Sequence, residues 1–586
     1  VTLDDILVYD QQQKKMLQIT RLATRLNIIE ILGGENVSIS SIQLFGLKAN
    51  LYKNNAQSKP NFQFVVDSLS SGGADSGLNL KIQSIIVRHG AVKYDDNAAP
   101  VKHDVISANH IDLKGISGHF VLESLTDKEA KVTVRSLAFE ENSGLAVKNL
   151  RFSLLADKYR ARINDFELEL GQSRVSIPRV EATYRTIEKG IDLDAMNLYA
   201  SIASSKLSPV DMAFLDRRLG RYGGAVYFSG DIEGGKRWIK IRKLNLRASK
   251  PFLSMLLDGQ IVNPFGNMKW NIRVASLHVG RNTCELFARD WKIPIPKEII
   301  RLGDVHFAGY SAGDKESVSL GGTLKSDLGR AKFNLKSGKT IQLALNTQGF
   351  NVGGLLNNSR LGMLTARMNV RLARNLSSVW AKGTVASFDF NGYSYKNIAV
   401  DGDYSNDTFN GMASINDAGG TLSVRGRIEN IRGFIEKRRH IITTVKIDAK
   451  SFNPERLNVT KAVNDKSFSF SASIEGRGSS LDNIMGSLSL ENFSMTGKNE
   501  QFAMNSLKLK IDNSMLRKML NVRTDFGEVN LNGQYDYTTL ERSVVRIART
   551  YFPMLFKDPW KMPILSKYNT FYIYAKLEKS DWLKPL

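Results

Sequence analysis

Short runs of alternating apolar and polar residues recur along the whole chain, and they restrict its fold more than any other feature. Residues 468–474 (FSFSASI) form one such run. A period of two places every second side chain on the same face of a β-strand, so each run has one apolar and one polar face. The runs are separated by Gly, Asn, Asp and Ser, which are the residues that turns prefer. The sequence therefore predicts an all-β chain.

The alternating runs also provide candidates for a functional apolar surface. Asn-Gly and Asp-Gly dipeptides between the runs are strong hairpin signals, for example at 391–392, 401–402, 410–411 and 532–533. They favour a mainly antiparallel sheet, with a β-bulge where Ile85-Ile86 breaks the alternation. The apolar candidates are Leu80, Ile82, Phe166, Leu168, Leu170, Trp270, Ile272, Val274, Phe468, Phe470, Ile474, Leu488 and Leu490.

Helical patterns are few and short. The spacing predicts short helices over 25–32, 207–220 and 513–520, the second of them starting with Ser208 before Pro209. A longer amphipathic helix is expected over 541–557, where Arg542, Arg546 and Arg549 lie off the apolar face. Such a helix packs against an end of the sheet, which is the commoner arrangement, or lies on a membrane. Its apolar face consists of Val544, Ile547, Ala548, Tyr551 and Leu555.

The organisation of the chain follows from its length and its lack of linkers. A chain of 586 residues normally divides into several domains, but its 13 Pro are scattered and no linker is visible. Open sheets rarely exceed about 10 strands without curling, splitting or closing. We therefore predict one continuous body, in which an elongated, coiled sheet folds into an apolar-lined groove. The groove is expected over 1–206, 221–540 and 558–586, and the two helices interrupt it.

Composition excludes several classes of protein. The net charge is +23, but the 81 basic residues are spread along the chain and not gathered in a patch, so nucleic acid is not an expected partner. A diffusely basic exterior suits an anionic membrane surface, or serves solubility.

Cys284 is the single cysteine, so no internal disulfide framework exists. No run of 18 apolar residues is present. Since Val1 already opens a strand, we expect a fragment or processed form whose targeting segment lies upstream.

The sequence offers no convincing catalytic motif. Residues 309–313 (GYSAG) match the nucleophile elbow around Ser311, but that motif needs a helix after the serine, and residues 317–320 resemble another strand. Cys284 is expected to be a small apolar core residue. Neither a phosphate loop nor a dinucleotide fingerprint is present. We therefore predict a protein that is not an enzyme and that binds no cofactor.

Histidines near residue 110 are the main candidates for a metal site. His103, His110 and His119 lie close together in the sequence, with Asp104 and Asp112 beside them. None of them has the tight i, i+4 spacing of paired zinc ligands on a helix, and on strands they give no obvious convergence. The sequence predicts no metal site.

Three segments resemble TamB-like proteins of the AsmA-like superfamily, in the variant typical of Bacteroidota-type bacteria. The first runs from the opening strand, residues 1–10, through 39–52 (ISSIQLFGLKANLY) to 62–64. The second is 207–235, a short helix followed by a glycine-rich strand. The third is 474–495, which is similar to a recurring G-x-l-x-x-l-x-G-x-l-x-l pattern. The resemblance covers most of the chain in pattern more than in identity.

The resemblance implies a periplasmic protein with a taco-shaped β groove, anchored in the inner membrane by a helix that this sequence lacks. We expect the protein to be monomeric. Proteins of this family are implicated in moving phospholipids toward the outer membrane. They are also linked to the assembly of outer-membrane or secreted β proteins, with a barrel partner of the Omp85 type. Two functions therefore stay open: a phospholipid bridge, and an assembly scaffold that pairs with strands of other proteins. Alternation alone does not separate an open groove from closed sandwich cores, which are the commoner arrangement.

Overall fold

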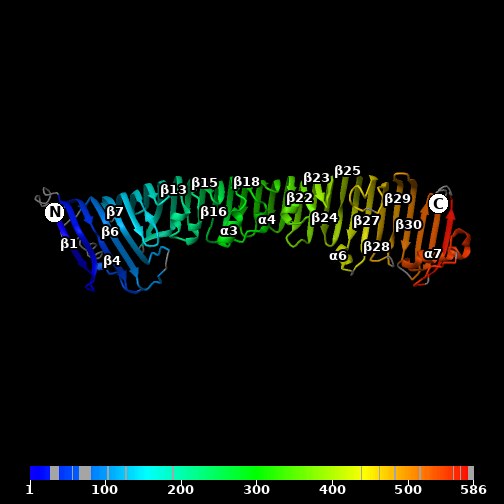
Figure 1. The fold of residues 1–586 in the computed structure, drawn as a ribbon, viewed down its shortest axis with the longest axis horizontal. Coiled ribbons are helices and arrows are strands. Elements are labelled where there is room, and N and C mark those ends of the chain that lie inside the picture. Colours follow the sequence, from blue (N-terminus) through cyan, green and yellow to red (C-terminus); the bar gives the residue numbers. More distant parts are fainter. Residues whose placement is uncertain are drawn as a thin grey trace. The chain divides into compact units, whose positions relative to one another are not determined.

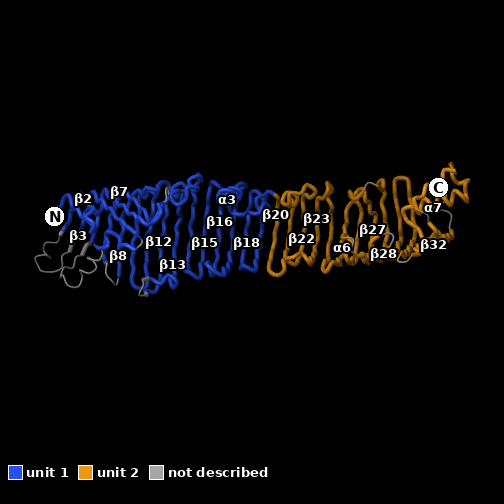
Figure 2. Tube along the Cα trace, turned by 90° about the horizontal axis from the view of Figure 1, so that it is seen from below, with its two compact units in different colours: residues 1–327 blue, residues 328–586 orange. Residues whose placement is uncertain are grey.

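The computed structural model places the chain in two compact units, unit 1 (Val1–Asp327) and unit 2 (Leu328–Leu586), coloured separately in Figure 2. It describes residues 1–26, 38–55, 57–64, 81–101, 105–125, 129–187, 190–436, 439–460, 462–480, 483–513, 516–558, 560–567 and 569–578. Leu80, His103 and Asp104 lie outside these residues, as does the side chain of Ile82. Within each unit, the strands lie side by side (Figure 1).

Unit 1 is a mainly antiparallel sheet. Near its N-terminus, β3 lies parallel to β5 and β6, and β4 lies parallel to β6. Further along, β8 pairs with β7, β9 and β10. Its strands are β1 (Thr2–Tyr9), β2 (Lys15–Leu26), β3 (Ser38–Phe45), β4 (Lys48–Lys53), β5 (Lys81–Ile82), β6 (Ser84–Asp96), β7 (His110–Leu125), β8 (Glu129–Glu141), β9 (Ala146–Val147), β10 (Asn149–Asp157), β11 (Arg160–Glu169), β12 (Arg174–Ile187), β13 (Gly190–Leu207), β14 (Val226–Gly235), β15 (Trp238–Ser249), β16 (Phe252–Val262), β17 (Lys269–Val279), β18 (Val305–Gly313) and β19 (Val318–Ser326).

Unit 2 is an antiparallel meander, in which each strand from β20 to β33 pairs with the next. The all-β, mainly antiparallel prediction is confirmed in both units. The strands of unit 2 are β20 (Gly329–Ser337), β21 (Thr340–Asn351), β22 (Leu361–Ala373), β23 (Ser378–Phe390), β24 (Tyr393–Ser405), β25 (Thr408–Asp417), β26 (Gly420–Glu429), β27 (Ile441–Phe452), β28 (Ser467–Gly478), β29 (Met485–Thr496), β30 (Gln501–Asp512), β31 (Lys518–Thr524), β32 (Gly527–Gln534) and β33 (Thr570–Leu577).

Helices are short, as the sequence predicts. Among the described residues, none is long and apolar enough to span a bilayer. Unit 1 contains the 3-10 helices η1 (Pro209–Met212) and η2 (Arg217–Arg221) and the α-helices α3 (Thr283–Trp291) and α4 (Lys297–Arg301). Unit 2 contains α5 (Val352–Leu356), α6 (Ile431–Ile435), α7 (Tyr537–Tyr551) and the 3-10 helix η3 (Pro553–Leu555).

Three of the expected helices differ from the structure. The segment over 207–220 forms two 3-10 turns, because the backbone at Asp216 is extended (φ −156°) and starts η2 as its N-cap. The helix expected over 25–32 is wrong at its start, since Arg25 and Leu26 end β2. The helix expected over 513–520 is wrong at its end, where Leu520 in β31 pairs with neighbouring strands on both sides. The amphipathic helix is confirmed over 541–551, and α7 begins four residues before the expected start. Its expected end at 557 is wrong, because α7 ends at Tyr551 and Pro553–Leu555 form the separate 3-10 helix η3.

The glycines of the four predicted hairpin dipeptides have two different structural roles. Asn391-Gly392 joins β23 to β24 with φ of 49° and 82°, so the predicted hairpin turn is confirmed. The dipeptides at 401–402, 410–411 and 532–533 lie inside strands instead, so the hairpins predicted there are wrong. Gly402 and Gly411 pair directly, and a Cβ on Gly411 would lie 2.7 Å from the Cα of Gly402. These glycines permit close approach of neighbouring strands.

The bulge expected at Ile85-Ile86 lies further along β6. Ile85 and Ile86 pair regularly with Phe120 and His119 of β7. The register shifts only after Val87, where His89 adopts a positive φ of 54°. The consecutive apolar residues therefore do not themselves mark the irregularity.

Candidate functional site

The register of unit 2 aligns the apolar positions of successive strands into rows that cross the sheet. In each row, a residue pairs directly with the next member on the neighbouring strand, from β21 to β33. One row consists of Leu343, Val370, Ala381, Gly402, Gly411, Gly426, Val445, Ile474, Leu488, Leu509, Val522, Val529 and Ala575. The adjacent row consists of Leu345, Met368, Gly383, Val400, Ala413, Val424, Ile447, Ala472, Leu490, Leu507, Thr524, Gly527 and Leu577. No member of either row carries a charge; together they define the unit 2 apolar face.

The opposite face of the same strands is polar and charged. Its ion pairs include Lys382 with Asp401, at 2.7 Å, and Arg427 with Glu429, at 2.9 Å. One row on this face consists of Gln342, Arg371, Trp380, Asp403, Asn410, Arg427, Thr444, Glu475, Ser487, Lys510, Asn521, Asn530 and Tyr574. The two faces therefore differ sharply in chemistry.

Unit 1 contains a corresponding row from β7 to β19, which we call the unit 1 apolar face. It consists of Leu122, Val132, Leu154, Ile163, Val180, Ala200, Ile232, Ile241, Gly259, Ile272, Ser311 and Leu320. Ser311 is its one hydroxyl-bearing member, and Ser311 Oγ accepts a hydrogen bond from Trp270 Nε1 at 2.9 Å. A tight turn and the strand β19 follow Ser311, so the helix of a nucleophile elbow is not there.

The candidate residues of unit 1 lie on or beside its apolar face. Ile272 belongs to the row itself, and Trp270 and Val274 alternate with it on β17. On β11, Phe166 pairs with Ile177 and Leu168 with Val175. The remaining candidate, Leu170, follows the end of β11 and is buried.

The candidate residues of unit 2 share one face. Ile474, Leu488 and Leu490 are members of the two rows, and Phe468 and Phe470 alternate with Ile474 on β28. Phenylalanines of three neighbouring strands and a turn extend this area, with successive ring centroids 5.9–6.4 Å apart. The rings are those of Phe468, Phe470, Phe493, Phe502 and Phe526.

The side chains of the apolar faces are only partly buried. The chain has an accessible surface of 37677 Å². Two compact globular units with its mass of 65.4 kDa would expose only about 25,000 Å². Most side chains of the rows, such as Leu343, Val445 and Leu509, are of intermediate exposure, and Val529 and Leu577 are exposed. The apolar rows are therefore not the interior of closed sandwich cores.

A hollow on the unit 2 apolar face has the dimensions of a ligand site. Its volume is about 360 Å³, and its lining includes Ile474, Leu488 and Leu509 on adjacent strands. Phe434 of α6 forms part of the wall. The hollow combines an apolar lining with an opening to solvent, as expected of a site for hydrocarbon.

Helix α7 packs through a polar stripe, not through its apolar one. Thr539 and Ser543 are buried, and both accept hydrogen bonds from Asn569 Nδ2, at 3.1 and 2.7 Å. At the start of the helix, hydrogen bonds from Lys567 and Thr538 hold the pKa of Asp536 well below its usual range. These polar contacts lie beside the apolar stripe of the helix and do not cover it.

The predicted apolar stripe of α7 consequently stays accessible. Tyr551 is 74% exposed and Leu555 in η3 is 78% exposed, while Val544 and Ile547 are also exposed and Ala548 is half-buried. The expectation that this stripe packs against an end of the sheet is wrong in the described part of unit 2. The interpretation as a membrane-contacting surface stays open.

The other candidate residues do not converge. His110 contacts Asp95 at 3.2 Å, whereas His119, further along β7, contacts Ser84 at the start of β6. The Asp112 carboxylate instead forms an ion pair with Lys114 at 3.5 Å. Burial raises the pKa of the Cys284 thiol, in agreement with a packing role.

Sequence reasoning missed one cluster of side chains. His278, Asp304 and His306 bring their possible ligand atoms within 4.8 Å of one another. The pairing of β17 with β18 creates the cluster, because 26 residues separate His278 from Asp304 and only the register joins them. The D-x-H spacing of 304–306 within an alternating run was the one signal that the sequence offered.

Comparisons with known proteins return no match. No protein-family model matches the chain, and neither a curated protein nor a solved structure does. The resemblance to TamB-like proteins therefore stays a prediction, as do the function and location that it implies.

Proposed function

We propose that this chain binds the acyl chains of phospholipids along its two apolar faces and conducts lipids between the inner and outer membranes of a bacterial envelope. The observation that supports the proposal most is the uncharged, partly exposed rows of paired apolar residues that cross each sheet. The proposed role is not enzymatic. Following the family resemblance, the proposal places the chain in the periplasm, as part of a protein anchored to the inner membrane.

The physical basis is the cost of exposing hydrocarbon to water. Burying one CH₂ group is favourable by about 0.8 kcal/mol, so two acyl chains leave a bilayer slowly without an apolar surface to receive them. The apolar rows supply that surface, while the polar face keeps its ion pairs in water. A phospholipid would lay its tails on the rows and keep its head group at the solvated margin.

The length of the rows favours a conduit over a pocket. Strands lie about 4.8 Å apart, so the twelve steps from β21 to β33 amount to about 60 Å along the sheet of unit 2. One leaflet of a bilayer core is about 15 Å thick. A row in this unit is therefore about four times the length of one lipid tail, which permits several lipids or movement of one.

Native mass spectrometry tests the proposal directly. The purified full chain, incubated with phosphatidylethanolamine and phosphatidylglycerol and transferred into a mild detergent, is expected to retain phospholipid, with more than one lipid per chain at saturation. A chain that emerges free of lipid under conditions that preserve its fold would contradict lipid binding.

A second candidate function is a scaffold for β proteins. Within the described residues, β33 is paired on one side only, with β32, and Tyr572, Ile573 and Tyr574 are exposed along it. Such an edge can accept a strand of an outer-membrane barrel protein or of an Omp85-type partner. Capture of an unfolded barrel by a chain without bound lipid would favour the scaffold over the conduit.

The exposed stripe of α7 gives a further prediction about membranes. Exposed arginines at 542 and 546 lie on the same helix as exposed Tyr551, an arrangement that favours anionic surfaces. We expect binding to vesicles that contain phosphatidylglycerol, measured by flotation, to fall about 3-fold or more in a Tyr551→Ser variant, and to weaken with added salt.

A matched substitution separates this effect from a general loss of surface aromatics. Tyr159 lies between β10 and β11 and is 67% exposed, close to the 74% of Tyr551. Tyr159→Ser is expected to leave vesicle binding unchanged. Equal losses in the two variants would show that α7 is not the membrane-contacting surface.

A further inference from the structure

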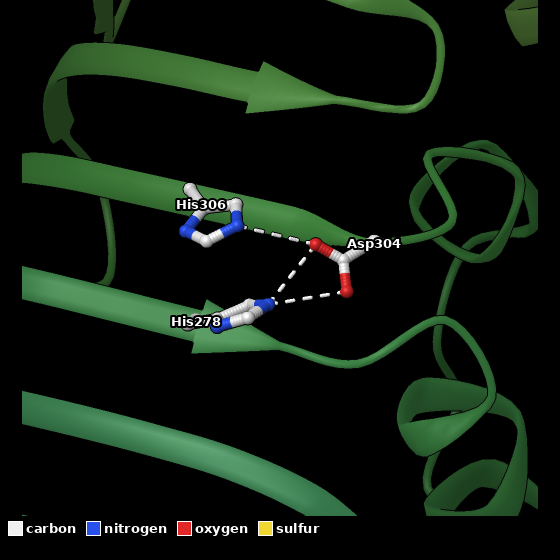
Figure 3. A group of neighbouring side chains, drawn as sticks. All are labelled: His278, Asp304 and His306. Carbon is white, nitrogen blue, oxygen red and sulfur yellow. Dashed lines mark hydrogen bonds and ion pairs between the residues drawn. The ribbon is translucent and has the colours of Figure 1, made fainter.

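Two histidines and an aspartate of unit 1 converge where β17 pairs with the start of β18 (Figure 3). Asp304 Oδ1 lies 3.0 Å from His278 Nε2 and 3.2 Å from His306 Nε2. The second carboxylate oxygen, Oδ2, lies 3.1 Å from His278 Nε2. The two imidazole rings are stacked with centroids 3.7 Å apart and planes at 23°. Three side chains therefore direct their possible ligand atoms into one small volume.

The sheet holds all three residues in place. His278 and His306 are directly paired residues of β17 and β18, and Asp304 immediately precedes β18. The backbone N–H of Asp304 donates to Asp327 Oδ2 at 2.8 Å. On the other side of the cluster, the ring of Phe252 packs 4.5 Å from the ring of His278. Strand pairing therefore fixes the two histidines, and Asp304 is held beside them at the start of β18.

We propose that His278, Asp304 and His306 bind a divalent transition-metal ion such as Zn²⁺. Two imidazoles and one carboxylate form a donor set that Zn²⁺ and its neighbours in the first transition series prefer. Ligand atoms about 2.0–2.1 Å from a tetrahedral ion lie about 3.3 Å from each other. The oxygen–nitrogen distances of 3.0 and 3.2 Å are close to that value. Coordination through Nε2 requires the proton of each neutral ring to lie on Nδ1.

The surroundings leave coordination positions open. His278 and His306 line a hollow of about 620 Å³, so water or another small ligand can reach an ion held there. Arg247 and Lys325 also line this hollow. Their charges oppose a cation, but they suit an anionic ligand on the open position of a bound metal. Three protein ligands with an open fourth position differ from the four protein ligands of a closed structural zinc site.

Metal titration of the full chain tests the proposal. After removal of metals with a chelator, the chain is titrated with Zn²⁺ in competition with a chromophoric chelator, and one ion per chain is expected. The affinity is expected to fall more than about 10-fold in His278→Ala, His306→Ala and Asp304→Asn. Co²⁺ bound to the wild-type chain is expected to give visible absorption bands that the three variants lose.

A control variant distinguishes the cluster from isolated histidines. His110 also contacts an aspartate, Asp95, at 3.2 Å, and no second histidine of the described residues joins that pair. His110→Ala is expected to leave Zn²⁺ affinity unchanged. Far-UV circular dichroism verifies that each variant is folded, and Asp304→Asn preserves side-chain size in case an alanine variant is not. Wild-type affinity in a folded Asp304→Asn or His306→Ala chain, or no Zn²⁺ binding by the wild type, would overturn the proposal.

Discussion

Replacing Leu488 with aspartate is expected to lower the amount of bound phospholipid at least about 10-fold, which corresponds to about 1.4 kcal/mol. Leu488 pairs with Ile474 and Leu509 in the middle of an uncharged row. It also lines the hollow of about 360 Å³ on the unit 2 apolar face. A carboxylate at this position has no cation in either apolar row to pair with, and it keeps water where an acyl chain would lie.

The neighbouring residue supplies a matched control. Ser489 lies on the opposite face of β29, where it pairs with Ser473 and Lys508. Ser489→Asp adds the same charge one residue away and gains a nearby lysine, so lipid binding is expected to stay at the wild-type level. Lipid occupancy by native mass spectrometry, and the rate of transfer of a fluorescent phospholipid between vesicles, measure both variants. Equal behaviour of Leu488→Asp and Ser489→Asp would refute acyl-chain binding on this face.

The faces of the strands were predictable because they depend only on local periodicity. Ile474 and Leu488 point to one side of their strands for the same reason that Ser473 and Ser489 point to the other. Whether that side is covered depends on other parts of the chain, so alternation alone left a closed core and an accessible surface both possible. The structure distinguishes them through the exposure of the rows.

Features that depend on register were not predictable. His278 and His306 become neighbours only because β17 and β18 pair in one of several possible alignments. A single sequence does not specify that alignment, and the segment with α3 and α4 separates the two strands. The position of Phe434 in the wall of the hollow was not predictable either. Phe434 belongs to α6, in the connection between β26 and β27, and sequence alone does not show where this connection meets the sheet.

Predictions from Asp-Gly dipeptides and from the amphipathic pattern of α7 were wrong for another reason. Each of these sequence patterns occurs in two different structural settings. An Asp-Gly pair is a turn signal in isolation, yet Gly402 serves close strand contact in the sheet. The apolar stripe of α7 resembles a packing surface, but the buried contacts of the helix are the hydrogen bonds from Asn569 to Thr539 and Ser543 beside that stripe. Such polar contacts between distant residues leave no periodic trace in the sequence.

Because strands of unit 2 are in close contact at glycines, we expect a Gly→Ala substitution there to lower stability, whereas such a substitution usually raises it. Replacing glycine by alanine ordinarily stabilises a protein by about 0.4–1 kcal/mol, because it restricts the unfolded chain. Gly426 sits on β26 in the row that also contains Gly402 and Gly411. A Cβ there would lie 2.3 Å from the carbonyl oxygen of Thr444 and 2.8 Å from the Cα of Val445. Both are backbone atoms, so no rotamer change relieves the overlap.

Gly426→Ala is therefore expected to destabilise the sheet by about 2 kcal/mol, since β26 and β27 must move apart to admit the methyl group. Urea denaturation followed by far-UV circular dichroism measures the change. Gly497, in the turn between β29 and β30 of the same unit, is the control: its added Cβ would come no closer than 3.4 Å to any atom. Gly497→Ala is expected to be neutral or slightly stabilising. A stabilised Gly426→Ala chain would show that these strands are not in close contact, and the continuous apolar row through the three glycines would lose its support.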